Sequence, residues 1–244
     1  MTSTGWGPIR RGIERLAFAG VSASDSDEVR VQKVSLTLAA VAVTVLAVIW
    51  VGTYLALDLP IPALIPFTYQ VASIAALVLF VRTKSYRLLR SSQLVLIIAL
   101  PFLLQWSLGG YIASSAVSLW ALEGAFGAVF FFSPRGSIPW FVAFVLLTVA
   151  SGFVEPVLAQ HAAAIASPIR DAFFVLNVVG PAATAYLLLQ YAVRARDAAM
   201  DRSERLLLNV LPKAIAERLK LETGVIAESH PDVTVVFADL VDFT

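Results

Sequence analysis

Five ionisable side chains in an otherwise apolar chain could do chemistry, one inside a predicted helix and four near helix ends. Glu123 lies in the middle of the apolar stretch Ser115–Phe132. A carboxylate there costs about 2.5–3.5 kcal/mol on insertion scales, and no Lys or Arg lies within an apolar stretch to pair with it. The other four are Asp58, Glu155, His161 and Asp171. Carboxylates and imidazole bind divalent cations, so the five residues are candidates for an outer cation or small-ligand site.

Three amide side chains are expected at the depth of Glu123. At about 1.5 Å per residue, Gln70, Gln105 and Asn177 lie about 9–12 Å from the outer ends of their helices, as does Glu123. One interpretation is that these groups hydrogen-bond across helices and fix the packing, with Glu123 protonated. The other is a polar floor beneath the four outer residues, open to an extracellular cation or small ligand. The sequence leaves both open.

Six apolar stretches of about 18–24 residues must position these groups, and each is long enough to cross roughly 30 Å of hydrocarbon as a helix. They are Val34–Leu57, Ala63–Val81, Gln93–Ile112, Ser115–Phe132, Ile138–Leu158 and Asp171–Val193. With 59% hydrophobic residues, 14% charged residues and a mean hydropathy of +0.81, the chain does not have the composition of a soluble domain. We predict an all-α membrane protein in which residues 34–193 form a bundle of six transmembrane helices.

The basic residues predict the orientation of this bundle. Lys and Arg are concentrated in residues 1–33, in the segment after the second stretch and directly after the sixth. The opposite connections contain a single basic residue, Arg170. Cytosolic segments carry the excess of Lys and Arg in membrane proteins, so we expect both termini in the cytosol and a multi-pass protein of the cell membrane.

Composition also limits the functional classes. The net charge is +1 and no basic patch is interleaved with aromatic residues, so nothing indicates a nucleic-acid partner. The chain has no Cys, which excludes disulfides and thiolate metal sites. A receptor or transporter remains an alternative. No inverted repeat is visible, and Pro101 and Pro181 are isolated kinks, which disfavours transport.

The tail begins as a continuation of the sixth helix. Residues 182–208 contain neither Gly nor Pro, so one helix is expected to run out of the bilayer into a cytosolic stalk. Residues 194–224 are assigned to this stalk and to a second helix that begins at Pro212. Residues 233–238 are β-branched and apolar, which is typical of a buried strand, and residues 225–244 are taken as the start of another domain.

These tail residues resemble a known family. The run LLLNVLPKAIAERLK is similar to the transducer segment that precedes class III nucleotide cyclase domains, and VTVVFADLVDFT resembles the first strand and metal-binding turn of the catalytic domain. Six spans followed by one such domain resemble the mycobacterial membrane adenylate cyclases, which are similar to half of a mammalian membrane adenylate cyclase. The resemblance covers roughly the last 40 residues and the overall architecture.

The resemblance implies an enzyme that converts ATP to 3′,5′-cyclic AMP and pyrophosphate as a membrane-embedded homodimer. It implies two divalent ions, Mg²⁺ or Mn²⁺, in each active site. Asp239 would be the first of the two metal-binding aspartates, and the Leu240 carbonyl would bind one of the metals. The amides of Phe243 and Thr244 would hold the triphosphate. Asp242 departs from the family pattern, in which Gly is commoner at this position of the turn.

The rest of such an active site would lie beyond Thr244. We therefore expect these residues alone to be inactive and to act as the membrane-anchoring, dimerising and regulatory region of the cyclase. The alternatives are a guanylate cyclase, or a receptor or transporter with a cyclase-like tail.

Overall fold

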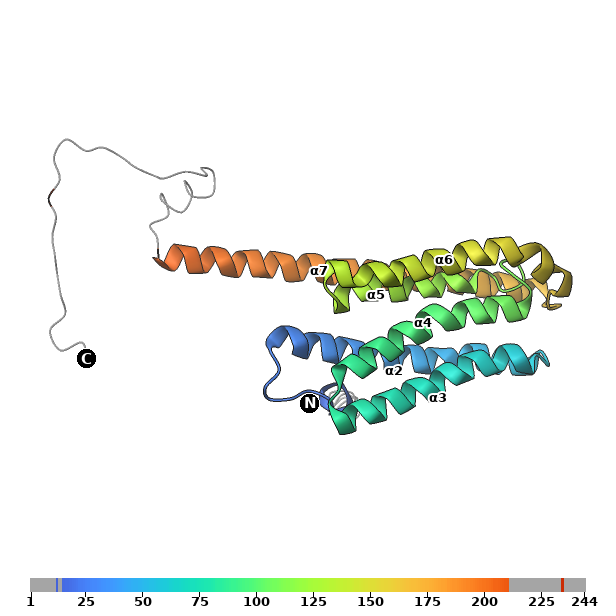
Figure 1. Cartoon of the computed structure of the whole chain (residues 1–244), viewed down its shortest axis with the longest axis horizontal. Helices are drawn as coiled ribbons and strands as arrows, with labels where there is room; N and C mark the ends of the chain where they lie inside the picture. Colours follow the sequence, from blue (N-terminus) through green and yellow to red (C-terminus); the bar gives the residue numbers. More distant parts are fainter. Residues whose placement is uncertain (1–11, 13–14, 211–233, 235–244) are drawn as a thin grey trace, which may run out of the picture. The chain divides into compact units, whose positions relative to one another are not determined.

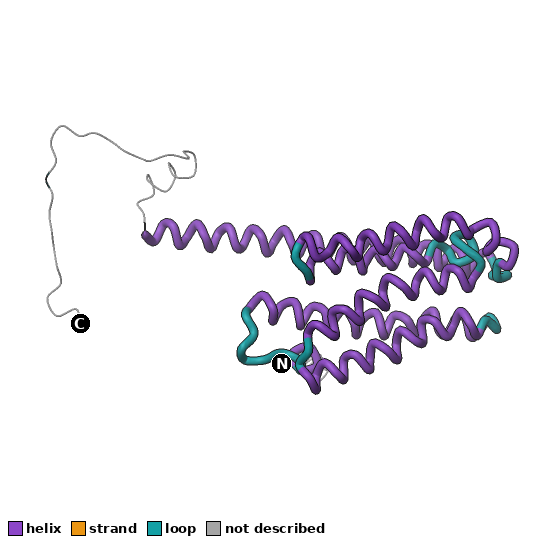
Figure 2. Tube along the Cα trace, viewed as in Figure 1, coloured by secondary structure: helices purple, strands orange, loops and turns teal. Residues whose placement is uncertain are grey.

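The computed structural model describes residues 12, 15–210 and 234, and the described elements are all helical (Figures 1 and 2). In chain order they are α2 (Asp27–Ala56), α3 (Pro60–Thr83), α4 (Tyr86–Leu108), the 3₁₀ helix η1 (Val117–Ala121), α5 (Leu122–Phe131), α6 (Pro134–Leu158), the 3₁₀ helix η2 (Ala159–His161) and α7 (Ser167–Val210). The second tail helix and the strand predicted for residues 233–238 lie outside the described residues, apart from Thr234.

Among the described residues, five helices are long and apolar enough to cross a membrane, and each overlaps one of the six predicted spans. Their spanning ranges are Asp27–Ala56, Pro60–Thr83, Tyr86–Leu108, Pro134–His161 and Ser167–Arg202. Only 6% of the most apolar part of α6 is buried inside the protein. The large apolar side chains on its surface, such as Phe153 and Leu146, would be unfavourable in water and suit lipid.

The fourth predicted span is not one long helix. Gly109 and Gly110 both adopt left-handed backbone conformations (φ 99° and 100°), which end α4 and which residues with a Cβ rarely adopt. Ser115 and Ala116 are also left-handed, so helical structure resumes only at Val117. A single spanning helix over Ser115–Phe132 was predicted from hydropathy, and hydropathy cannot detect a break in the helical backbone. The segment is instead a 3₁₀ helix followed by the ten-residue α5.

Helix ends follow local sequence rules. The Ser26 hydroxyl accepts a hydrogen bond from the Val29 N–H and begins α2, with Asp27 and Glu28 in the first turn. Ser133 caps α6 in the same way through the Gly136 N–H. α3 begins with Pro60, where a missing N–H costs nothing.

The helices α2, α3 and α4 pack successively against each other, and α4 also packs against η1, α5 and α6. Gly124 permits the close approach of α5 to α4, because a Cβ at this position would overlap the Ile98 side chain. One cluster of buried apolar side chains is centred on Trp50, Leu108 and Trp120, and a second on Phe80 and Leu89.

The helix α7 is 44 residues long and continues to Val210 with Pro181 inside it. This confirms the prediction that the last span continues as a helix beyond the length a membrane requires. The chain divides into two compact units after Leu187, so α7 contributes its first half to the unit that contains the bundle.

Candidate functional site

The catalytic residues implied by the resemblance cannot be placed. Asp239, Leu240, Phe243 and Thr244 all lie outside the described residues. Their roles therefore stay predictions from the sequence.

The predicted outer site does not assemble as a metal-binding group. Within residues 12, 15–210 and 234, no three His or acidic side chains lie where they could hold a metal ion together. The Glu155 carboxylate instead accepts hydrogen bonds from the backbone N–H of Tyr111, at 3.0 and 3.1 Å to its two oxygens. The Nδ1 of His161 lies 3.4 Å from the Val157 carbonyl of its own helical turn, and Asp58 and Asp171 are exposed.

The contact of Glu155 has a structural reason. A Cβ on Gly110 would overlap the Glu155 carboxylate, so the left-handed glycine and the acid are fitted to each other. The Tyr111 hydroxyl also donates to the Thr148 carbonyl of α6 at 2.8 Å. Glu155 therefore links the segment after α4 to α6 by hydrogen bonds, a role that its position in the sequence did not indicate.

The predicted polar layer separates into packing contacts and unpaired groups. The Gln70 amide of α3 donates to the Thr44 carbonyl of α2 at 3.0 Å, as the packing interpretation expects. Gln105 is fully buried, and neither its amide nitrogen nor its amide oxygen has a hydrogen-bond partner among the described residues. One carboxylate oxygen of Glu123 is likewise buried without a partner in this part of the chain.

A second polar contact set joins α2, α3 and α4. The Tyr69 hydroxyl donates to Oε1 of Gln93 at 3.1 Å, and the Gln93 amide donates to the Ser73 hydroxyl at 3.1 Å. The Thr44 hydroxyl lies 3.2 Å from the Ser73 hydroxyl. These residues were not among the predicted site residues, although a Gln and hydroxyl groups within apolar helices are a recognisable signal for interhelical hydrogen bonds.

Asn177 joins α7 to the broken fourth segment. Its side chain is fully buried, and its Oδ1 accepts a hydrogen bond from Nε1 of Trp120 at 3.0 Å. Its amide nitrogen donates to the carbonyls of Ser115 at 2.9 Å and Ser114 at 3.4 Å. The Ser115 hydroxyl in turn donates to the Arg170 carbonyl at 2.8 Å. Two carbonyls released by the break, those of Ser114 and Ser115, are thus satisfied by α7.

Aromatic residues of α2 contact both η1 and α7. Trp50 meets Trp120 edge-to-face at a centroid distance of 5.7 Å and Phe173 of α7 at 5.8 Å. Tyr54 stacks on Phe173 at 5.8 Å. Such pairs contribute about 0.5–1.5 kcal/mol each beyond the area they bury. Trp50 and Trp120 therefore both contact α7.

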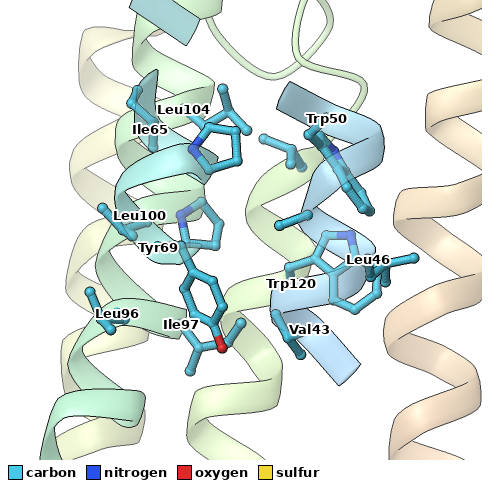
Figure 3. Close-up of a pocket in the computed structure, with 14 residues that line it drawn as sticks. Val43, Leu46, Trp50, Ile65, Tyr69, Leu96, Ile97, Leu100, Leu104 and Trp120 are labelled. Atoms are coloured by element: carbon cyan, nitrogen blue, oxygen red, sulfur yellow. The ribbon is translucent and has the colours of Figure 1, made fainter. Parts of the chain in front are cut away.

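An apolar pocket lies beside the two tryptophans (Figure 3), between α2, α3, α4 and η1, with a volume of about 80 Å³. Trp50 and Trp120 lie on one side of it, and Tyr69 and Leu100 on the other. Pro66 and Pro101, which interrupt the hydrogen bonding of α3 and α4, also line it. None of the described residues that line the pocket is charged.

Basic residues form contacts at the end of the bundle where α4 begins and α5 ends. Arg90 donates to the Phe131 carbonyl at the end of α5 at 2.8 Å, and its guanidinium lies 3.7 Å from the centroid of the Phe132 ring. In the first turns of α2, the Lys33 ammonium contacts both carboxylate oxygens of Asp25, which precedes the helix, at 2.7 and 2.8 Å. The hydrogen bond from Lys33, and then that from the Ser22 N–H, lower the pKa of the Asp25 carboxyl.

Comparison with curated proteins gives matches at 32% identity over 161 residues. The relatives come from Mycobacterium bovis and from two strains of Mycobacterium tuberculosis. All three are adenylate cyclases. The match covers 55% of this chain and 34% of each relative. The predicted resemblance to mycobacterial adenylate cyclases is confirmed.

The aligned part thus represents about a third of the length of these relatives. No family model matches the chain, and no solved structure matches it.

Proposed function

We propose that this chain is the membrane region of a class III adenylate cyclase, which anchors the enzyme, brings two copies together and regulates cyclic AMP formation from ATP. The observation that carries the proposal is the similarity to mycobacterial adenylate cyclases in a chain whose described part has five membrane-capable helices. The last of these helices, α7, continues toward the cyclase-like sequence VTVVFADLVDFT.

The proposal includes six membrane crossings with both termini in the cytosol. The Ala163 N–H donates to the Leu108 carbonyl at 2.9 Å, so α4 and α6 end side by side. The bond from Arg90 to the Phe131 carbonyl places the end of α5 beside the start of α4. The fourth segment, Val117–Phe131, therefore runs antiparallel to α4 over about 25 Å, close to the roughly 30 Å of hydrocarbon.

In the catalytic domain, the proposed roles follow from the resemblance. Asp239 and the Leu240 carbonyl would hold Mg²⁺ or Mn²⁺, which would lower the pKa of the ribose 3′-hydroxyl and neutralise the triphosphate. The backbone amides of Phe243 and Thr244 would bind the phosphates. In class III cyclases the active site forms between two catalytic domains, which is why the proposal includes a homodimer.

The test measures cyclic AMP formation by the full-length protein in membranes. Asp239→Ala is expected to reduce the rate at least about 100-fold, because it removes a metal ligand. Asp242→Gly, three residues further along the same turn, is the matched control and is expected to retain activity, since it restores the commoner family residue. Wild-type activity in Asp239→Ala would refute the proposed metal role. Formation of cyclic GMP in place of cyclic AMP would refute the proposed substrate.

A further inference from the structure

A groove between α3 and α4 changes from polar to apolar along its length. Its volume is about 610 Å³, within the range of roughly 300–1,000 Å³ that is typical of ligand pockets. The two helices lie side by side (Figure 1), and the groove follows one face of α4 from its first turn. Its lining on α4 extends from Arg87 to Leu96, which corresponds to about 14 Å along the helix axis.

The end of the groove where α4 begins is polar and positively charged. Ser85, Arg87 and Ser91 line it. Arg87 is exposed, and among the described residues neither its side chain nor the Ser91 hydroxyl has a hydrogen-bond or ion-pair partner. Ser85 precedes α4 without capping it through its side chain, so the positive end of the helix dipole also lies here. An anionic group at this end would gain an opposite charge and hydrogen-bond donors.

The other end of the groove is apolar and lies within helices that can span a membrane. Ala72 of α3 lines it together with Val95 and Leu96 of α4. Val95 is 53% exposed, and the other two residues are half-buried, so the groove is open to the medium around the bundle. At this depth that medium is hydrocarbon. A ligand that fills the whole groove therefore needs an anionic head and an apolar chain.

The charges of the two helices distinguish among membrane lipids. No Asp or Glu occurs in residues 59–122, which include α3 and α4. Basic residues are instead concentrated around the connection between the helices, at Arg82, Lys84, Arg87 and Arg90. The ammonium group of a zwitterionic lipid would find no carboxylate from either helix, whereas a lipid with a net negative charge meets only attraction.

We propose that this groove binds an anionic phospholipid, with its phosphate at Arg87 and Ser91 and one acyl chain along Val95 and Ala72. A free phosphate ion would occupy only the polar end and leave the apolar surface of the groove uncovered, which favours a lipid. In the proposed orientation α4 begins on the cytosolic side, so the lipid belongs to the inner leaflet. Binding itself does not require the proposed cyclase activity.

Binding is tested by thermal unfolding of the purified protein in uncharged detergent, with dioleoyl phosphatidylglycerol, dioleoyl phosphatidylcholine or inorganic phosphate added. Phosphatidylglycerol is expected to raise the melting temperature most, because a ligand of the folded state stabilises it by mass action. Phosphatidylcholine, which has the same chains, should give a smaller rise, and inorganic phosphate almost none. Equal rises with the two lipids would overturn the preference for a net negative charge. An equal rise with inorganic phosphate would overturn the assignment to a lipid.

Arg87→Gln tests the site of the head group. It removes the charge from an exposed position and is expected to raise about tenfold or more the phosphatidylglycerol concentration that gives half of the maximal rise. Arg135→Gln is the matched control, because Arg135 is also exposed and lies in the first turn of α6, outside the groove. It should respond like wild type. A wild-type response in Arg87→Gln would overturn the proposed site, and so would an equal loss in Arg135→Gln, which would indicate only a general attraction to basic residues.

Filling the apolar end tests the position of the acyl chain. Ala72→Leu adds three carbon atoms to the groove wall and is expected to remove most of the rise with phosphatidylglycerol. Ala75→Leu makes the same change at an exposed position of α3 outside the groove and should leave the rise unchanged. If Ala72→Leu does not fold, Val95→Trp at the exposed part of the wall serves instead. A full rise in a folded, filled variant would overturn the proposed placement of the chain.

Discussion

The hydrogen bonds of Asn177 make a quantitative prediction about the attachment of α7. Asn177→Ala removes the acceptor for Nε1 of Trp120 at 3.0 Å and the donor to the Ser115 carbonyl at 2.9 Å. Interhelical hydrogen bonds in membrane proteins average about 0.6 kcal/mol and reach about 1.7 kcal/mol. Two such bonds give an expected loss of about 1–3 kcal/mol in the free energy of unfolding, and every 1.4 kcal/mol changes the equilibrium about tenfold.

The measurement is reversible unfolding in mixed micelles, followed by circular dichroism and by tryptophan fluorescence. A double-mutant cycle with Trp120→Phe, which removes only the indole donor, is expected to give a coupling energy of about 0.6–1.7 kcal/mol. Val178→Ala is the matched control, because this neighbour on α7 is exposed and should lose much less. A loss for Asn177→Ala no larger than that for Val178→Ala, or a coupling energy of zero, would refute the proposed junction.

Three further predictions test the membrane orientation, the contact of Arg90 with the end of α5 and the ion pair between Asp25 and Lys33. Because the chain has no Cys, Ala164→Cys is a unique label site and should react from outside sealed cells, while tags at both termini stay protected; labelled termini would overturn the six-crossing arrangement. Arg90→Leu should lower the free energy of unfolding by about 1–3 kcal/mol, because it leaves the Phe131 carbonyl without this charged donor, whereas Arg87→Leu on the exposed face should cost little. The folded-state pKa of Asp25 is below its ordinary value of 3.8, so its contact with Lys33 stabilises the folded state above pH 3.8. This stabilisation is lost as the pH falls through the folded-state pKa. Asp25→Asn should therefore flatten this part of the profile of melting temperature against pH.

The placement of the helices was largely predictable from the sequence. Hydropathy and length located five spans, because a helix must satisfy its own backbone in lipid and therefore needs a long apolar run. The extension of α7 followed from the absence of Gly and Pro over residues 182–208. The resemblance to mycobacterial adenylate cyclases came from short motifs whose order and spacing are specific, and the comparisons bear it out.

The predicted cation site depended on the directions of side chains, which the sequence pattern does not give. Counting residues gives the depth of a side chain along a helix, but it does not give the direction in which the side chain faces. Glu155 was placed correctly near a helix end, yet its carboxylate faces the backbone N–H of Tyr111. The direction depends on how α6 packs against the turn after α4, which is a tertiary contact.

The break in the fourth segment also depends on tertiary contacts. The composition of Ser115–Phe132 suits a membrane helix, and the sequence places this stretch directly after the third one. The break is stabilised by Asn177, whose amide donates to the released carbonyls of Ser114 and Ser115, and Asn177 lies 62 residues from Ser115 in the sequence. A single chain's pattern of apolar residues carries no information on that pairing.

The sequence thus determined where five long apolar helices form and that α7 continues past its span, because these depend on local composition. The tertiary structure alone decided that Trp50 and Trp120 border a pocket and that both contact α7. An apolar stretch is apolar on every side, so hydropathy cannot indicate which faces of the helices meet. Shape and the few buried hydrogen bonds decide this, and they do so only when the helices are packed together.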